Sequence, residues 1–337
     1  MKKNIGIYLF ISVILFSLFG LLMIYSSSYI WADYKFGDGL RYVKLQGLFL
    51  LVGTFLMLII SRIDYKLYYK YSFPIFLFCL ILLILVLIPG IGKIRNGSRS
   101  WFGIGSLGIQ PSEFMKLSLI ILVSKYLSNS NKDIKSFFKG IMPVLMVLGV
   151  VFLLIMLQPD LGTGMIIILS ILSLLFIAGA NMKFFFIAGF VGIIGIVILI
   201  IIAPYRMDRI TSFINPWSDP LGTGFQIIQS LYAIGPGGLF GLGLFNSRQK
   251  HFYLPEPQTD FIFSIISEEL GIVGILVVAS FFIFILYCGI KISLNSKNLF
   301  SKYLSFGMTF QILIQAVMNL MVVVGLIPVT GYTLPCD

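Results

Sequence analysis

Charged side chains are scarce in this sequence, and acidic ones are the scarcest. The 337 residues include 13 Asp and Glu, one His and three Cys, and charged residues make up 11% of the chain. Soluble domains carry about 25% charged residues, so the composition excludes a soluble globular protein. The single His has no His or Cys cluster beside it that could form a zinc site. Cys79 and Cys288 lie within apolar runs, which predicts buried thiols and no disulfide framework.

Long apolar segments dominate instead, with 58% hydrophobic residues. A membrane span needs about 20 mostly apolar residues, and each span must be helical because lipid offers the backbone no hydrogen-bond partners. The sequence therefore predicts an all-α polytopic membrane protein with one membrane domain over residues 1–337. Its candidate spans are 5–25, 43–61, 73–89, 112–128, 141–158, 163–180, 184–203, 261–290 and 303–326. The first is too long for a signal peptide and lacks a cleavage site, which indicates a retained span.

The distribution of Lys and Arg favours a cytoplasmic N-terminus, because most of them then fall on the cytoplasmic side. Much of the net charge of +11 is thus explained by the orientation of the chain in the membrane, and we expect no nucleic-acid partner. Basic residues on the outer side predict an anionic partner such as a lipid phosphate; ordinary solvated loop charges are the alternative. The outer basic residues behind this prediction are Lys93, Arg95, Arg99, Arg206, Arg209, Arg248 and Lys250.

The only long segment between spans covers residues 204–260, after the seventh predicted span. Prolines and glycines interrupt it, yet "FQIIQSLYAI" and "GGLFGLGLF" are too apolar for water. Irregular backbone at membrane depth is tolerated only where protein or a wet cavity shields it. We expect short or re-entrant helices here, and a long, partly buried loop of this kind is usually functional.

Asp260 ends this loop, where "PEPQTDF" leads into an apolar segment. If the helix begins near Thr259, Asp260 lies in its first turn, and it shares one polar face with Ser264 and Ser267. Glu268 lies on the flank of that face. An ionisable group at membrane depth is by default a functional hypothesis. A helix cap that pairs with Arg248 or Lys250 is the alternative.

Two shorter motifs also carry ionisable groups. In "QPSEFMK", Pro111 suits a first helical turn, Ser112 is a candidate cap, and Glu113 and Lys116 lie three residues apart on one helix face. They form either a functional pair or a structural ion pair at the membrane rim. In "QPDLGT", the short connection predicts a tight helical hairpin, and Asp160 is expected to cap its second helix.

Several long motifs in this order resemble the shape, elongation, division and sporulation (SEDS) family, which includes RodA, FtsW and SpoVE. The resemblance covers nearly the whole chain. It rests on "GSRSWFGIGSLGIQPSEFMKL", "QPDLGT", "RITSFINPWSDPLGTGFQIIQSLYAIGPGGLFGLGL", "SRQKHFYLPEPQTDFIFSIISEELG" and "MNLMVVVGLIPVTG". Family members have a tenth span, whereas this sequence stops at "TLPCD", so nine spans are expected here.

The resemblance implies a peptidoglycan glycosyltransferase of the bacterial cytoplasmic membrane. Such an enzyme polymerises lipid II on the outer face, beside a class B penicillin-binding transpeptidase and other elongation, division or sporulation proteins. The essential loop aspartate of the family matches Asp260, and Gln258 lies in the same motif. Functional positions of the family also match Arg99, Trp101, Glu113, Lys116 and Asp160.

Chemistry suggests a role for each position. Asp260 is the candidate general base for the attacking sugar hydroxyl, in a single inverting displacement. Fixed cations would stabilise the departing undecaprenyl pyrophosphate. The candidate cations are Lys116, Arg99, Arg206, Arg209, Arg248 and Lys250. A divalent cation such as Mg or Mn could share the pyrophosphate charge, although the sequence has no dedicated metal cage. A lipid II flippase and a non-catalytic scaffold for the transpeptidase are the alternatives.

Overall fold

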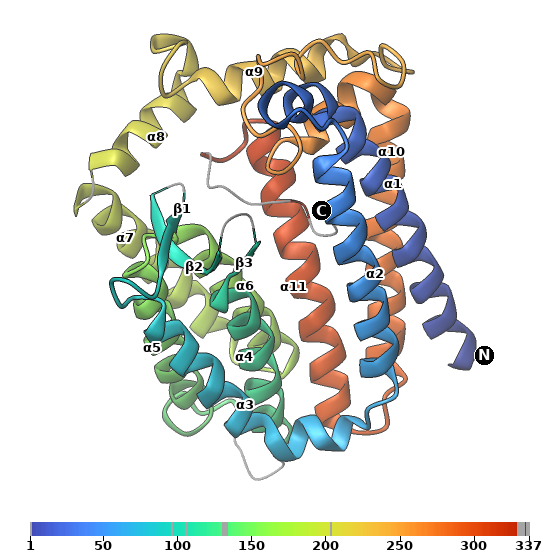
Figure 1. Ribbon diagram of the computed structural model, residues 1–337. Coiled ribbons are helices and arrows are strands. Elements are labelled where there is room, and N and C mark those ends of the chain that lie inside the picture. Colours follow the sequence, from blue (N-terminus) through green and yellow to red (C-terminus); the bar gives the residue numbers. More distant parts are fainter. Residues whose placement is uncertain are drawn as a thin grey trace. The chain divides into compact units, whose positions relative to one another are not determined.

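The computed structural model describes residues 2–95, 97–104, 107–129, 134–202, 204–328 and 334 (Figure 1). The chain divides into two compact units. Unit 1 comprises Met1–Arg62, Ile194–Cys288 and Gln315–Asp337, and unit 2 comprises Ile63–Ile193 and Gly289–Ile314.

A helix occupies each of the nine predicted spans, which confirms the all-α membrane fold. Six of these segments are long and apolar enough to cross a membrane, and two further apolar helices are shorter. The chain is therefore a multi-pass membrane protein. The nine helices are α1 (Lys2–Phe36), α2 (Arg41–Ser61), α3 (Tyr65–Leu85), α4 (Pro111–Ser128), α5 (Met142–Met156), α6 (Leu161–Ile177), α7 (Met182–Ile202), α10 (Ile262–Leu294) and α11 (Leu299–Val323).

The predicted bounds of α3 were wrong at both ends. The helix begins at Tyr65 rather than at 73, because Asp64 caps it by accepting a hydrogen bond from the Lys66 backbone N–H at 2.9 Å. The Tyr- and Lys-rich first turns are helical but not apolar, so a hydropathy pattern does not detect them. The helix also ends at Leu85, four residues before the predicted end.

A three-stranded antiparallel sheet follows α3 in unit 2, in a segment that the sequence had predicted only as an outer loop. Its strands are β1 (Lys93–Arg95), β2 (Ser98–Ile104) and β3 (Leu107–Ile109), in the order β1-β2-β3. Lys93 pairs with Trp101, and the Arg95 guanidinium lies 4.9 Å from the Trp101 ring centroid.

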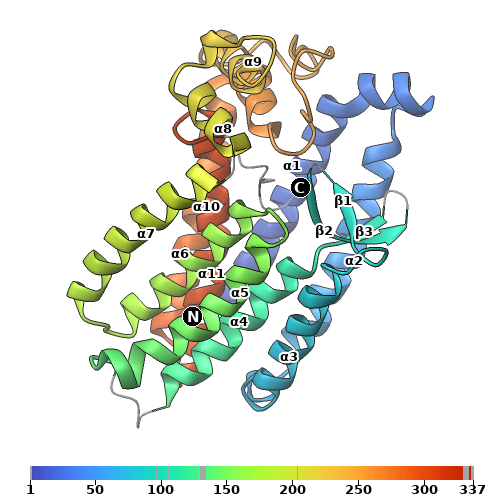
Figure 2. The same cartoon turned by 90° about the vertical axis from the view of Figure 1, so that its left-hand side faces the viewer.

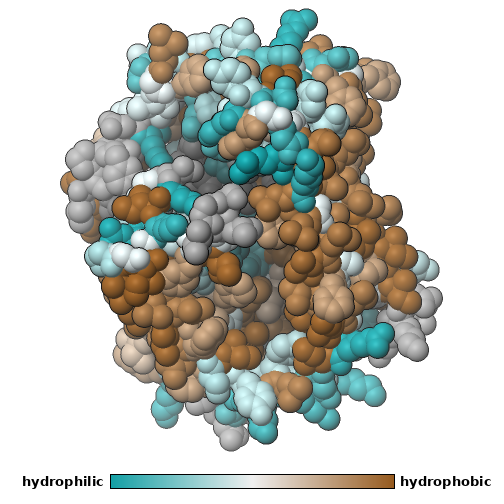
Figure 3. All heavy atoms as spheres, in the orientation of Figure 1, coloured by the Kyte–Doolittle hydropathy of each residue, from teal (hydrophilic) through white to brown (hydrophobic). Residues whose placement is uncertain are grey.

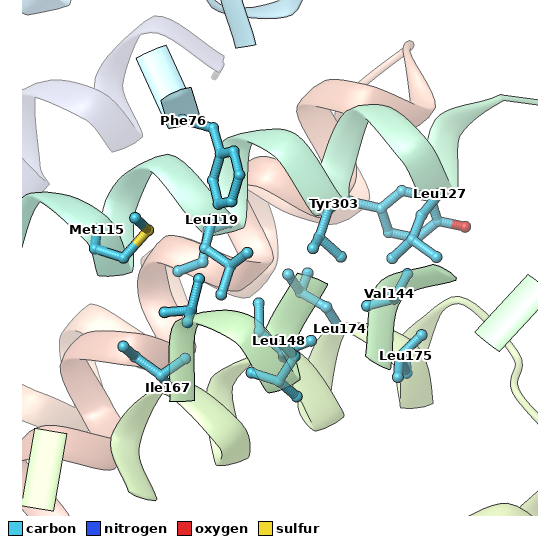
Figure 4. Packing of buried hydrophobic residues seen from close by; sticks show 14 of the residues in the cluster. Phe76, Met115, Leu119, Leu127, Val144, Leu148, Ile167, Leu174, Leu175 and Tyr303 are labelled. Atoms are coloured by element: carbon cyan, nitrogen blue, oxygen red, sulfur yellow. The ribbon is translucent and has the colours of Figure 1, made fainter. Parts of the chain in front are cut away.

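The core of unit 2 is a cluster of buried apolar side chains from α3, α4, α5, α6 and the first part of α11. Met115, Leu119 and Leu174 are completely buried in it, and Figure 4 shows Leu119 pointing toward Phe76 and Leu174 toward Leu148. Because lipid is as apolar as these side chains, helices associate in a membrane through close packing rather than through hydrophobicity. The core therefore depends on the fit between its side chains.

Unit 1 contains α1, α2, the loop after α7, most of α10 and the end of α11. The Phe16 ring of α1 stacks on the Phe281 ring of α10, with ring centroids 3.7 Å apart. The helix α2 has no buried residue, and apolar side chains cover much of its surface in Figure 3. This exposure fits a helix that faces lipid.

The helix α10 is broken inside unit 1. Gly271 has φ 61° and ψ −149°, which interrupts the helix directly after Glu268, Glu269 and Leu270. The break frees backbone groups that a regular helix would pair. A glycine-rich part of the long loop supplies partners for them: Leu242 N–H donates to the Glu268 carbonyl at 2.9 Å, and the Gly238 carbonyl accepts from Ile272 N–H at 3.0 Å.

Candidate active site

The long loop contains short helices. "FQIIQSLYAI" forms a helix as predicted, whereas "GGLFGLGLF" forms turns, so the prediction of a helix there was wrong. The loop contains α8 (Pro204–Ile214), a 3-10 turn at Pro216–Ser218, α9 (Phe225–Ile234) and a second 3-10 turn at Gly235–Gly237. Ser230 on α9 is fully buried, and its hydroxyl lies 2.6 Å from the Val323 carbonyl and 2.8 Å from the Ser264 hydroxyl. These contacts fix α9 against α10 and the end of α11 within unit 1 (Figure 2).

Asp260 lies two residues before α10 and not in its first turn, as would follow from a start near Thr259, although the predicted span 261–290 begins within one residue of the helix. A run of turns continues through Phe261, and α10 begins at Ile262. The Asp260 backbone carbonyl accepts a hydrogen bond from the Asn319 side chain at 2.9 Å. The main chain at Asp260 is therefore held by α11 and not by helical hydrogen bonds of α10.

The carboxyl group of Asp260 is partly buried and poorly solvated. Burial, and secondly the negative charge of Glu256, raise its pKa from 3.8 to about 6. The alternative role for Asp260, a helix cap that pairs with Arg248 or Lys250, requires an ion pair. Among the described residues, Asp260 forms no ion pair with either of them. A carboxyl group whose pKa lies near neutrality can take up and release a proton at working pH.

Gln258 lies beside Asp260 in sequence and is buried. Its Nε2 donates to Glu256 Oε2 at 3.2 Å, while its Oε1 is buried without a partner among the residues that the structure describes. Glu256 itself is exposed and has φ 48°. This short turn thus presents an exposed carboxylate, a buried amide and the Asp260 carboxyl group within five residues.

Lys250 lies in an interior ion pair and not on the loop surface. Its Nζ lies 2.9 Å from Glu269 Oε1 and donates to the Phe245 carbonyl at 2.6 Å. The Ser26 hydroxyl of α1 also donates to Glu269, at 2.7 Å. Sequence reasoning did not assign a role to Glu269 or Ser26, because their contact joins residues 243 positions apart. In this arrangement the Lys250 ammonium is not offered to an anion outside the loop.

The predicted arginines of the loop have different surroundings. The side chains of Arg248 and Arg209 are exposed. Arg206 falls within α8, and its side chain lies outside the described part of the structure. Arg248 combines an exposed guanidinium with a fixed main chain, because its backbone N–H donates to Glu268 Oε1 at 2.8 Å.

Unit 2 carries the other predicted pair. Lys116 Nζ lies 2.8 Å from Glu113 Oε2, which confirms the expected ion pair; the Lys116 side chain is 2% exposed and that of Glu113 is 49% exposed. Pro111 occupies the first turn of α4 as predicted, but Ser112 does not cap the helix. Gln110 takes the cap position, and the Ser112 hydroxyl is buried inside the first turn.

Asp160 caps α6, as the sequence predicted. Its carboxylate accepts from the Thr163 N–H at 3.0 Å and from the Thr163 hydroxyl at 2.8 Å. The Gln110 side chain donates to it at 3.1 Å, which joins the start of α6 to the start of α4. Arg99 on β2 is partly buried and donates weakly to the Leu87 carbonyl at 3.4 Å.

The candidate residues thus fall into two groups. Asp260, Gln258, Arg248, Lys250, Arg206 and Arg209 belong to unit 1, whereas Glu113, Lys116, Arg99 and Asp160 belong to unit 2. Over the part of the chain with assigned positions, no three His, Cys, Asp or Glu side chains gather as a metal-binding group. The described residues therefore offer no fitting cage for the divalent cation, and no reaction step is assigned to a metal.

Comparison with known proteins gives one consistent family. The family model of the FtsW, RodA and SpoVE cell cycle proteins matches residues 7–336. Stage V sporulation protein E of Bacillus subtilis is 50% identical over 334 residues, which cover 99% of this chain and 91% of that protein. The probable peptidoglycan glycosyltransferase FtsW of Geobacter sulfurreducens is 40% identical over 317 residues, covering 94% of this chain and 85% of that protein.

Solved structures agree with this result. A chain from a peptidoglycan synthase complex that coordinates polymerization and crosslinking superposes with a TM-score of 0.75 at 28% identity, covering 95% of this chain and 90% of that chain. A mutant of the rod shape determining protein RodA of Thermus thermophilus has a TM-score of 0.69 at 23% identity, covering 98% and 88% of the two chains, and shares the fold.

Proposed function

The chain belongs to the FtsW, RodA and SpoVE family, and from that premise we propose how it works as a peptidoglycan glycosyltransferase. The named relatives support this activity. In the proposed reaction, lipid II is polymerised at the outer face of the cytoplasmic membrane, with the N-terminus of the chain in the cytoplasm. A class B penicillin-binding protein is the proposed partner, in line with the synthase complex that the fold resembles.

The single observation that supports the mechanism most directly is the raised pKa of the Asp260 carboxyl group. This pKa is about 6, raised by burial and by Glu256. A general base works best when its pKa lies near the operating pH. The ionised Asp260 accepts the proton of the sugar hydroxyl as the oxygen attacks the anomeric carbon of the second unit. The bond to undecaprenyl pyrophosphate breaks in the same displacement, with inversion at that carbon.

The leaving diphosphate gains negative charge, so cations that meet it lower the barrier. Arg248 and Arg209 have exposed side chains in the same unit as Asp260. Lys116 and Arg99 are further candidates from unit 2, where Glu113 orients the Lys116 ammonium. Lys250 contributes indirectly, because its ammonium neutralises Glu269 in the interior of the loop.

A reconstituted assay tests the proposal. The protein is purified with its cognate transpeptidase, whose crosslinking centre is inactivated, and is supplied with labelled lipid II. We expect glycan strands from the native chain and none from Asp260→Ala or Asp260→Asn. Polymer that persists in both variants would refute the role of Asp260. Lipid translocation without polymer would indicate a flippase, and neither activity would indicate a scaffold for the partner.

A further inference from the structure

The main chain of residues 247–249 is hydrogen-bonded to two adjacent buried carboxylates. Glu268 and Glu269 are 1% and 0% exposed. Glu268 accepts hydrogen bonds from the Ser247 hydroxyl, from Arg248 N–H at 2.8 Å and from Gln249 N–H at 3.4 Å. Glu269 accepts from Ser247 N–H at 3.2 Å. Consecutive N–H groups of the loop thus converge on the last helical turn before the break in α10, and this contact fixes the path of the loop.

The two carboxylates differ in how their charge is balanced. Glu269 has the Lys250 ammonium at 2.9 Å and the Ser26 hydroxyl at 2.7 Å. Glu268 forms no ion pair with any residue whose position is described, and its recorded partners are N–H and O–H groups of the loop. A buried carboxylate without a cation is costly, and an apolar side chain would often serve stability as well or better. What Glu268 contributes is the conformation of the loop.

Arg248 is the residue that this conformation presents. Its backbone is held by Glu268, and its neighbours Ser247 and Lys250 are buried, but its own side chain is exposed. Within the described ranges its guanidinium has no ion pair or hydrogen bond. A guanidinium is a fork of donors that matches phosphate oxygens in two-point contacts. Because its backbone is already fixed, binding of such an anion has to order only the Arg248 side chain and not the loop as well.

We propose that Glu268 is a positioning residue, which fixes the main chain at Arg248 so that the Arg248 guanidinium binds the diphosphate of the lipid-linked donor. This inference rests on the proposed transferase function and adds to it a pair of residues with distinct roles. Arg248 contacts the ligand, whereas Glu268 acts only through Arg248. The two substitutions must therefore be coupled.

A double-mutant cycle with undecaprenyl pyrophosphate in detergent micelles tests the coupling. The proteins are the native chain, Arg248→Gln, Glu268→Gln and the double variant. We expect either single change to weaken binding about tenfold, equivalent to about 1.4 kcal/mol, and the double variant to lose no more than Arg248→Gln alone. With lipid II, Glu268→Gln should change KM and kcat in the same proportion as Arg248→Gln does, because Glu268 acts only through Arg248. Amide hydrogens of residues 247–250 should exchange faster in Glu268→Gln but not in Arg248→Gln.

A matched control is Asp38→Asn, which removes one exposed carboxylate of the same unit and should change neither binding nor exchange. Ser247→Ala removes one hydrogen-bond donor to Glu268 but keeps the negative charge of Glu268. It provides a milder test if Glu268→Gln fails to fold. Additive losses, or unchanged binding in Glu268→Gln and Ser247→Ala, would overturn the inference. If glycan synthesis continues while the losses are additive, only the positioning role fails. Coupled binding in a chain that makes no glycan would instead refute the transferase.

Discussion

Asn319, near the end of α11, donates a hydrogen bond from its side-chain amide to the backbone carbonyl of Asp260 at 2.9 Å. Asn319 is completely buried, so this bond links a buried helix position to the residue proposed as the general base. Because Asp260 lies before the first turn of α10, its main chain has no helical hydrogen bonds that would fix it. The position of its carboxyl group therefore depends on α11.

Replacement of Asn319 by Ala should greatly slow glycan synthesis while lowering the free energy of unfolding only slightly. The loss of one neutral hydrogen bond costs about 1 kcal/mol, but a small displacement of a general base can lower the rate by about 100-fold. The measurements are the rate of polymer formation from lipid II and the thermal midpoint of the purified protein. Asn295→Ala provides the control, because Asn295 also donates to a backbone carbonyl, that of Lys291 at 2.8 Å, at an exposed position. Equal rates in the two variants would contradict the prediction.

The burial of Asp260 predicts how stability depends on pH. Its pKa is raised from 3.8 to about 6, so the folded protein binds this proton more tightly than the unfolded chain does. The contribution to stability is fully present below pH 4 and is lost as pH rises through about 6, to a limit of about 3 kcal/mol. Asp260→Asn stays neutral at every pH. Its thermal midpoint should therefore rise relative to that of the native chain between pH 4 and 7, and a constant difference would contradict this.

The same pKa predicts the pH dependence of the reaction. Since the base must be ionised, glycan synthesis should increase as pH rises through about 6 and then reach a plateau. The charge of Glu256 contributes to the raised pKa of Asp260, so Glu256→Gln should move the midpoint of the pH–rate profile to lower pH. An unchanged midpoint, or one moved to higher pH, would show that a different group controls the rate.

Local sequence patterns were sufficient for the features that depend on neighbours in the chain. The three-residue spacing of Glu113 and Lys116 predicted their ion pair, and the short "QPDLGT" connection predicted both the hairpin and the cap at Asp160. Apolar runs located the nine helices that occupy the predicted spans, six of which are long and apolar enough to cross a membrane. In each case the relevant contact is made within one helix or across one turn, where spacing alone determines which groups meet.

Features that depend on distant contacts were not predictable in this way. The ion pair of Lys250 with Glu269 forms because the loop folds back on α10, and the contact with Ser26 needs α1 as well. Asp260 was expected in the first helical turn because its residue type suits that position, but α10 begins two residues later and the Asp260 carbonyl bonds to the distant Asn319. One local signal was available: two adjacent glutamates in an apolar segment require buried partners.

The ion pair in unit 2 predicts an asymmetry between its two members. Lys116 is buried and Glu113 is half exposed, so removal of the glutamate leaves a buried ammonium without that counter-charge, whereas removal of the lysine leaves a carboxylate that water can reach. Glu113→Gln should therefore lower the free energy of unfolding more than Lys116→Met does. The expected difference is about 1–2 kcal/mol after allowance for the exposure of Glu113, and thermal unfolding measures it. Both variants should lose glycan synthesis. A larger loss of stability in Lys116→Met would show that the ammonium makes stabilising contacts beyond this ion pair, because methionine keeps the aliphatic stem.

Gly241 provides the strictest test of the loop on which the proposed site depends. It has φ +76°, and a Cβ atom there would lie 2.1 Å from the Glu269 carbonyl oxygen, at the break in α10. The oxygen belongs to the backbone of α10, and the position of the Cβ is set by the backbone of the loop, so the clash can be relieved only by separating the loop from the helix. Gly241→Ala should destabilise the protein by more than about 2 kcal/mol and abolish glycan synthesis.

Gly235→Ala in the same loop is the matched control, since Gly235 has φ −57° and open space around its Cβ position. It should keep both stability and activity, and similar losses in the two variants would mean that the loop tolerates no substitution, rather than that the contact with Glu269 is essential.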